Sequence, residues 1–139
     1  RRGSLLGVLD RTKTSMGARK LKQWLEKPLI NPIEINKRLY SVEELSKNIM
    51  VCDELRELLA GIYDISRIMS RISLNSASPR DMVALKASLL KLPELNYQLS
   101  KTTSPLLSDL NKNFDIMGDI DDIKLTVIDE GEQKEKLSD

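Results

Sequence analysis

Aliphatic side chains recur at steps of three and four residues over most of this chain, and strong helix-start signals interrupt the pattern. Residues 31–34 read Asn-Pro-Ile-Glu and residues 78–81 read Ser-Pro-Arg-Asp. In both, a capping side chain precedes a proline at the first helical position, and an acid stands three residues after the cap. Residues 102–105, Thr-Thr-Ser-Pro, open a further short segment. Because strands repeat every two residues, this period predicts helices.

The helix pattern divides the chain at recognisable stops. Pro28 should end the helix that Thr14 or Ser15 caps, because the residue before a proline avoids the α region. Gly61 marks a bend, and Pro93 kinks or restarts a helix. The predicted helical segments are 4–10 (a short helix or turn), about 15–27, 31–49, 52–62, 65–72, 79–92, a continuation to Leu99, and 105–110, with a loop at 75–78.

The fold class that this pattern predicts is all-α: a compact multi-helix bundle, with orthogonal or antiparallel helices and short loops. Leu occurs 23 times and Ile 12 times, whereas Phe, Trp and Tyr together occur five times, which suits helices better than sheets. The apolar stripes should form the core. Replacing Leu39, Leu58 or Leu89 with Ala should then cost about 2–5 kcal/mol of stability.

Charge divides the chain into regions. Residues 1–27 carry eight basic and two acidic side chains, and residues 115–139 carry three basic and nine acidic ones. We expect a helical core domain over 1–110 and a weakly helical acidic extension with a frayed tail over 111–139. Within that extension, residues 125–128 (Leu-Thr-Val-Ile) are compatible with helix or strand.

The composition removes several kinds of chemistry. The chain has no histidine and one cysteine, Cys52, so it holds no His-based triad and no Cys/His zinc site of its own. No G-x-x-x-x-G-K-[ST] or G-x-G-x-x-G motif is present, so no phosphate-binding loop is expected.

Cys52 should be a small core residue. The acidic pairs at 121–122 and 129–130 are expected to form a solvated face rather than a cation site. The chain by itself is expected to be neither an enzyme nor a cofactor-binding protein.

Residues 4–29 carry a denser pattern, S-L-L-G-V-L-D-R-T-K-T-S-M-G-A-R-K-L-K-Q-W-L-E-K-P-L. This stretch resembles the opening of the core domain of MutS-family DNA mismatch-repair proteins, L-L-x-x-L-D-x-T-x-T-x-M-G-x-R-x-L-x-x-W-L-x-x-P-L. The matching positions are Leu5, Leu6, Leu9, Asp10, Thr12, Thr14, Met16, Gly17, Arg19, Leu21, Trp24, Leu25, Pro28 and Leu29.

The resemblance continues over about residues 3–100. Matches to three later family segments are Arg38, Val42 and Leu45, then Asp64, Arg67 and Arg71, then Pro79, Asp81, Leu85, Leu92 and Pro93. Toward the end the chain departs from the family, which has a V-D-E-P-P-like stretch before long lever helices and a DNA clamp. Here residues 127–130 (Val-Ile-Asp-Glu) are followed by Gly131 and a polar tail. With no initiator Met at its start, the chain is expected to be a piece of a larger protein, ending before the lever and clamp.

The resemblance implies a role in a larger protein. The parent would be a DNA-dependent ATPase that recognises mispaired duplex DNA, binds ATP or ADP with Mg at a P-loop, acts as a dimer and recruits MutL, in the bacterial cytoplasm. The helical core would link its DNA-binding parts to its ATPase. The family's mismatch-reading F-x-E is absent, since the only Phe is Phe114, and so is the P-loop. No catalytic, nucleotide-binding or mismatch-contacting residue is therefore assigned.

Within this piece, Asp10 to Leu29 combine Gly, Trp, Arg and Asp in a short stretch, and we interpret them as a rigid joint. Gly17 would permit close approach of two helices, and Trp24, on the apolar sector of its helix with Leu21, would anchor the joint in the core. Asp10 and Arg19 would make fixed polar contacts. The alternative is that this stretch only folds the domain.

Two other functions fit the same residues. The chain could be a free-standing helical scaffold or protein-binding module, or a small basic domain that binds DNA through its N-terminal charges. The formal net charge of +1 predicts weak DNA binding by the isolated chain or none.

Overall fold

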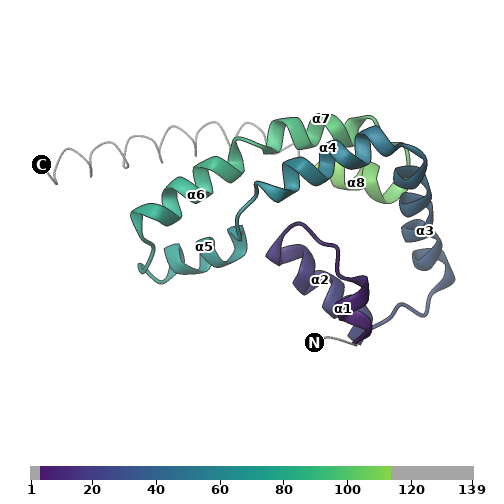
Figure 1. Cartoon of the computed structure of the whole chain (residues 1–139), viewed down its shortest axis with the longest axis horizontal. Helices are drawn as coiled ribbons and strands as arrows, with labels where there is room; N and C mark the ends of the chain where they lie inside the picture. Colours follow the sequence, from purple (N-terminus) through teal and green to yellow (C-terminus); the bar gives the residue numbers. More distant parts are fainter. Residues whose placement is uncertain (1–3, 114–139) are drawn as a thin grey trace, which may run out of the picture.

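The computed structural model describes residues 4–113, and all regular secondary structure in that range is helical (Figure 1). The all-α prediction is confirmed. The helices are α1 (Leu5–Leu9), α2 (Ser15–Glu26), α3 (Pro32–Lys47), α4 (Ile49–Ala60), α5 (Ile65–Ser73), α6 (Pro79–Leu89), α7 (Leu92–Ser100) and α8 (Pro105–Asn113).

The predicted helix starts are formed by the expected side chains. The Thr14 hydroxyl accepts the Gly17 N–H at 2.9 Å, and the Asn31 side chain accepts the Ile33 N–H at 2.9 Å. Ser78 and Asp81 form a reciprocal capping box at the start of α6. These bonds satisfy N–H groups that have no partner within the helix, so the starts of α2, α3 and α6 are fixed locally.

The best-packed part of the molecule combines α3, α4, α7 and α8. Figure 1 shows α4 beside α7, α8 on the far side of them, and α3 running across their end. The buried cluster at its centre consists of Val51, Leu55, Leu95, Leu99 and Leu107. We call these four helices the core bundle. The helices α5 and α6 form a separate hairpin, and Ile68 and Leu85 are its buried apolar residues.

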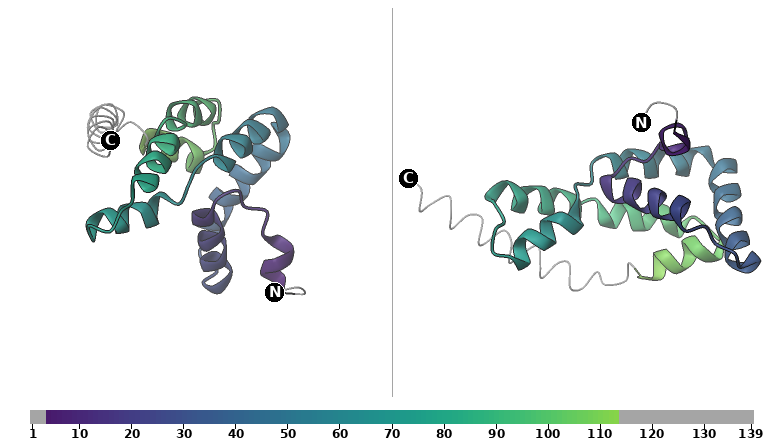
Figure 2. Two further views of the ribbon diagram at one scale, coloured as in Figure 1. Left: turned by 60° about the vertical axis from the view of Figure 1, so that its left-hand side comes forward. Right: turned by 90° about the horizontal axis from the view of Figure 1, so that it is seen from below.

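The helices α1 and α2 lie beside the core bundle rather than inside it (Figure 2). Neither helix contains a buried residue. We call residues 4–27 the N-terminal arm. The arm therefore adds almost nothing to the buried apolar core, although its sequence has a clear apolar sector.

Only part of the predicted stripe along α3 reaches the core. Leu45 is half-buried and packs against the buried cluster, whereas Leu39 is 58% exposed and Val42 is 64% exposed. The buried residue of α3 is Ser41, whose hydroxyl lies 3.1 Å from that of Ser104. The prediction that Leu39 is a core residue was wrong.

The break between α3 and α4 lies earlier than predicted. The sequence pattern places it after Ile49, at the end of the stripe of α3, but α3 ends at Lys47 and Ile49 begins α4. The Asn48 side chain accepts the Val51 N–H at 3.4 Å and caps α4. Ile49 is 66% exposed as a result. Leu58 and Leu89, the other two predicted core leucines, are half-buried, as is Cys52.

Toward the end of the described residues the helix starts agree with the prediction and the helix ends differ. Pro93 lies in the first turn of α7, but α6 already ends at Leu89, before a turn at 90–91. The last helix, α8, continues to Asn113, beyond the predicted end at 110. The predicted acidic extension begins at 111, and most of it, with the acidic pairs at 121–122 and 129–130, lies outside the described residues.

Candidate functional site around Asp64

Asp64 joins the N-terminal arm to the α5–α6 hairpin. The Arg19 guanidinium on α2 donates from Nη1 to Asp64 Oδ2 at 2.6 Å and from Nη2 to Oδ1 at 2.8 Å. Two parallel charge-assisted bonds of this kind fix orientation as well as distance. The Asp64 side chain is 17% exposed and that of Arg19 is 43% exposed, so the carboxylate is the less hydrated partner.

The same carboxylate starts α5. Asp64 Oδ1 accepts the backbone N–H of Arg67 at 3.3 Å, which makes Asp64 the N-cap of that helix. An anion at a helix N-terminus is also favoured by the helix dipole. The Arg19 hydrogen bonds, with a smaller contribution from this N–H, outweigh the effect of burial and lower the pKa of Asp64 to about 2.

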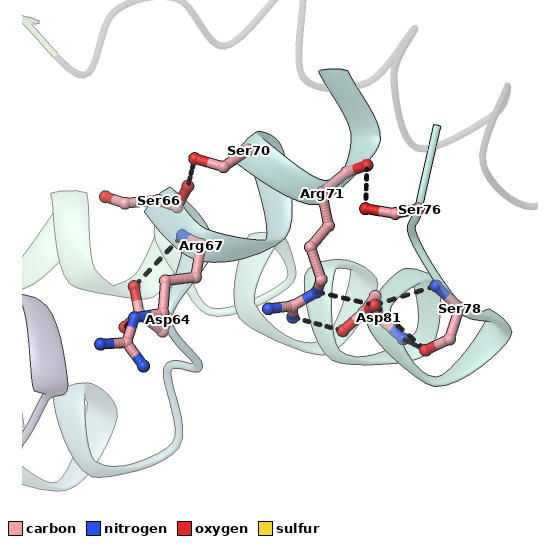
Figure 3. Close-up of polar contacts among 8 residues, drawn as sticks. All are labelled: Asp64, Ser66, Arg67, Ser70, Arg71, Ser76, Ser78 and Asp81. Atoms are coloured by element: carbon pink, nitrogen blue, oxygen red, sulfur yellow. Dashed lines mark hydrogen bonds and ion pairs between the residues drawn. The ribbon is translucent and has the colours of Figure 1, made fainter. Parts of the chain in front are cut away.

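A second guanidinium lies next to Asp64. Arg67 Nε is 3.5 Å from Asp64 Oδ2, and the Arg67 side chain is 70% exposed (Figure 3). Asp64 is thus flanked by one arginine from the arm and one from its own helix. Only the arginine from the arm makes a close fork with it.

The other end of α5 carries a second fork. Arg71 Nε donates to Asp81 Oδ2 at 3.0 Å and Arg71 Nη2 donates to Asp81 Oδ1 at 2.5 Å. Asp81 also accepts the Ser78 N–H at 2.9 Å as part of the capping box of α6 (Figure 3). Hydrogen bonds from Arg71, then from Ser78, hold the pKa of Asp81 well below its usual range. The hairpin is therefore tied to the arm at one end and closed on itself at the other.

Trp24 contacts the core bundle through a cation instead of by burial. The guanidinium carbon of Arg38 on α3 lies 3.6 Å from the centre of the Trp24 ring, a cation–π contact. Trp24 remains 37% exposed. The prediction that Trp24 is a buried core anchor was therefore wrong, although Trp24 does connect α2 to α3.

The nearest partners of Gly17 and of Asp10 are residues close to them along the chain. A Cβ on Gly17 would meet Thr14 Oγ1 at 3.0 Å and Thr12 Cβ at 3.5 Å, so its nearest neighbours belong to its own helix start rather than to a second helix. The expectation of close helix approach at Gly17 was wrong. Asp10 Oδ1 accepts two hydrogen bonds from Thr12, one from its backbone N–H at 3.0 Å and one from its side-chain hydroxyl at 2.7 Å. Asp10 thereby shapes the turn between α1 and α2.

The partners of Arg19 and Trp24 were not predicted as such. In the sequence, Asp64 and Arg38 stand out only as positions that match the family segments. One feature of the sequence could have indicated that Asp64 and Arg38 make specific contacts: both are charged, and core packing does not explain a charged residue at a motif position. Their pairing depends on contacts between residues far apart in the chain, and no local pattern encodes it.

Two further observations limit the chemistry of residues 4–113. Within this range no group of three or more Asp, Glu, Cys or His side chains is placed to hold a metal ion. No helix in the same range is both long and apolar enough to cross a membrane.

Comparison with known proteins identifies the family. The family model described as MutS domain III matches residues 1–138. DNA mismatch repair protein MutS of Caldanaerobacter subterraneus subsp. tengcongensis is 48% identical over 120 residues, which is 86% of this chain and 14% of that protein. The proteins of the same name from Caldicellulosiruptor bescii and Lachnoclostridium phytofermentans are 48% identical over 120 residues and 45% identical over 123 residues.

The match covers most of this chain but only a small part of each relative. The chain spans 13–14% of the length of these three relatives, and it is similar to one region of each. The matched region contains both sides of the Arg19–Asp64 fork and of the Trp24–Arg38 contact. The chain belongs to the MutS domain III family.

Proposed function

We propose that this chain serves DNA mismatch repair as a non-catalytic core domain, which links the parts of a larger protein that bind mispaired DNA to its ATPase. The family match supports the repair role. The larger protein would bind mismatched duplex DNA, use ATP or ADP with Mg, act with a second copy and with MutL, and work in the bacterial cytoplasm. None of these activities is assigned to residues of this chain.

The observation that carries the linking role is the fork between Arg19 and Asp64. Asp64 caps α5, so a displacement of α2 pulls directly on the first turn of α5. The Arg71–Asp81 fork continues the connection from the end of α5 to the start of α6. A chain of fixed polar contacts between rigid helices can pass a displacement on, provided that it has two arrangements that the linked sites favour differently.

The linking role is tested in the full-length protein by mismatch-stimulated release of ADP. Arg19→Ala should reduce the stimulation by mismatched DNA, while the thermal midpoint and ADP release without DNA stay at the wild-type value. Arg56→Ala is the matched control, since Arg56 is an exposed arginine on α4 that takes part in neither fork. This control should behave like the wild type.

A conservative variant separates linkage from folding. Arg19→Lys keeps the positive charge beside Asp64 and leaves the N-cap of α5 in place, so it should recover part of the mismatch stimulation that Arg19→Ala removes. Normal stimulation in Arg19→Ala, or a lowered thermal midpoint as its only effect, contradicts the linking role.

A protein-binding module is the alternative, and the exposed apolar face of α3 favours it. Leu39 and Val42 are more than half exposed on that face. If binding of another protein is the whole function, Leu39→Ser with Val42→Ser should abolish repair while mismatch-stimulated ADP release remains normal.

A further inference from the structure

The N-terminal arm is attached to the rest of the molecule by side chains. Among residues 4–113, no backbone hydrogen bond joins the arm to α3–α8. The arm contributes no residue to the buried cluster. The hydrogen bonds and ring contacts that join the arm to the other described helices are the Arg19–Asp64 fork and the Trp24–Arg38 stack. Met16, Leu21 and Leu25 of α2 are half-buried. An element held in this way can separate from its neighbours without disturbing the core.

Separation of the arm costs mainly the hydrogen bonds to Asp64. The Asp64 side chain is 17% exposed while Arg19 covers it, and separation replaces two charge-assisted hydrogen bonds with contacts to water. A second cation near Asp64 would offset part of this loss.

Arg67 is placed to be that cation. It lies three residues after Asp64 on α5, so it stays near the carboxylate wherever the arm goes, and its Nε is already 3.5 Å from Oδ2. Its side chain is 70% exposed and free to rotate toward both oxygens. Arg71, one turn further on, is held by Asp81, and Arg38 is stacked on Trp24.

We propose that the N-terminal arm docks and undocks by exchange of Arg19 for Arg67 at the carboxylate of Asp64. In the docked state Arg19 makes the fork, and Arg67 has only a longer contact of 3.5 Å with the carboxylate. In the undocked state Arg67 takes the carboxylate, and α5 keeps its N-cap. The inference rests on the arm's contacts and not on the linking role proposed above, so either can fail alone.

Amide hydrogen exchange in the full-length protein, read by mass spectrometry for peptides from α2, α4 and α7, tests this exchange. An undocked α2 should fray, because isolated helices of about twelve residues are marginal in water. Arg19→Ala should speed exchange in α2 by about two- to fivefold, in keeping with a partly exposed ion pair. Exchange in α4 and α7 should stay unchanged.

The distinguishing variant is Arg67→Ala. It removes the cation of the undocked state, so exchange in α2 should become about two- to threefold slower than in the wild type, the size expected for an exposed contact. A merely supporting role for Arg67 in the docked state predicts the opposite sign. Arg56→Ala again serves as the control and should leave all three peptides unchanged.

The proposal is overturned by any of three results. Faster exchange of α2 in Arg67→Ala would show that Arg67 reinforces docking. Unchanged exchange of α2 in Arg19→Ala would show that Asp64 does not hold the arm. Faster exchange in α4 and α7 along with α2 would show that the arm and the core bundle open as one unit.

Discussion

Arg19 and Asp64 are 45 residues apart in the chain, and two hydrogen bonds of 2.6 and 2.8 Å join them side chain to side chain. This fork connects a helix without buried residues to the capping residue of another helix. The position of the arm thus depends on paired charges as well as on partial burial of the apolar side of α2.

Acid should undock the arm. The pKa of Asp64 is lowered from 3.8 to about 2, so its contribution to docking is fully present above about pH 4 and is lost as the pH falls toward 2. Trp24 is the only tryptophan of the chain and is stacked under Arg38, so its fluorescence reports docking. We expect a fluorescence transition between pH 4 and 2 in this chain.

Two variants check the assignment of that transition to Asp64. Arg19→Ala should abolish the transition, because without the fork the protonation of Asp64 no longer breaks a contact with the arm. Asp64→Asn has no charge to lose and should show no transition of this origin. An identical transition in the wild type and Asp64→Asn would refute the prediction.

Truncation of two leucines should have unequal effects. Leu99 is 6% exposed and belongs to the buried cluster, whereas Leu39 is 58% exposed. Leu99→Ala should cost about 2–5 kcal/mol, since it leaves a cavity. Leu39→Ala should change stability by less than about 0.5 kcal/mol, as surface changes do. Midpoints of urea unfolding measure both, and equal losses would show that α3 packs differently from the structure.

Ser88 should contribute more to the stability of the fold than its small side chain suggests. It is 0% exposed, and its hydroxyl accepts the Tyr63 N–H at 2.9 Å and donates to the Ala84 carbonyl at 2.8 Å. Ser88→Ala would leave that N–H without its acceptor, at a cost of about 1–3 kcal/mol. Ser73→Ala is the control, because the exposed Ser73 hydroxyl only donates within its own helix. Calorimetric melting should separate the two variants, and equal melting temperatures would contradict the prediction.

Glu44 should stabilise the start of α8 from another helix. Its carboxylate accepts the backbone N–H of Thr103 at 2.6 Å and that of Ser104 at 2.8 Å. Burial raises its pKa, but these two bonds and the Thr103 hydroxyl outweigh burial and lower it. Glu44→Gln should cost about 1 kcal/mol, as loss of a helix cap does.

The loss in Glu44→Gln should be largest above the ordinary pKa of a glutamate and should shrink as acid protonates Glu44 in the wild type. Glu43→Gln is the matched control, since Glu43 pairs only with exposed Lys47 on its own helix. Urea midpoints at pH 7 and pH 3 measure the difference. A loss that is the same at both pH values would show that the charge of Glu44 does not stabilise α8.

Local sequence predicted most helix boundaries because local bonds create them. The capping hydrogen bonds of Thr14, Asn31 and the Ser78–Asp81 pair join residues at most three positions apart. Both partners of each bond therefore lie within one short sequence motif. Asn48 was missed because the apolar period continues across it, from Leu45 to Ile49. The helix nevertheless ends there and a new one begins.

The sequence by itself determined that this chain is helical, where most helices start, and, through its resemblance to a known family, what kind of protein it belongs to. Only the tertiary structure decided which apolar face is buried, since Leu39 and Leu99 look alike in a periodic pattern and differ in what packs over them. The tertiary structure also decided the partners of Arg19 and Trp24. Pairing of distant charges depends on how whole helices are placed, and helix period carries no information about that placement.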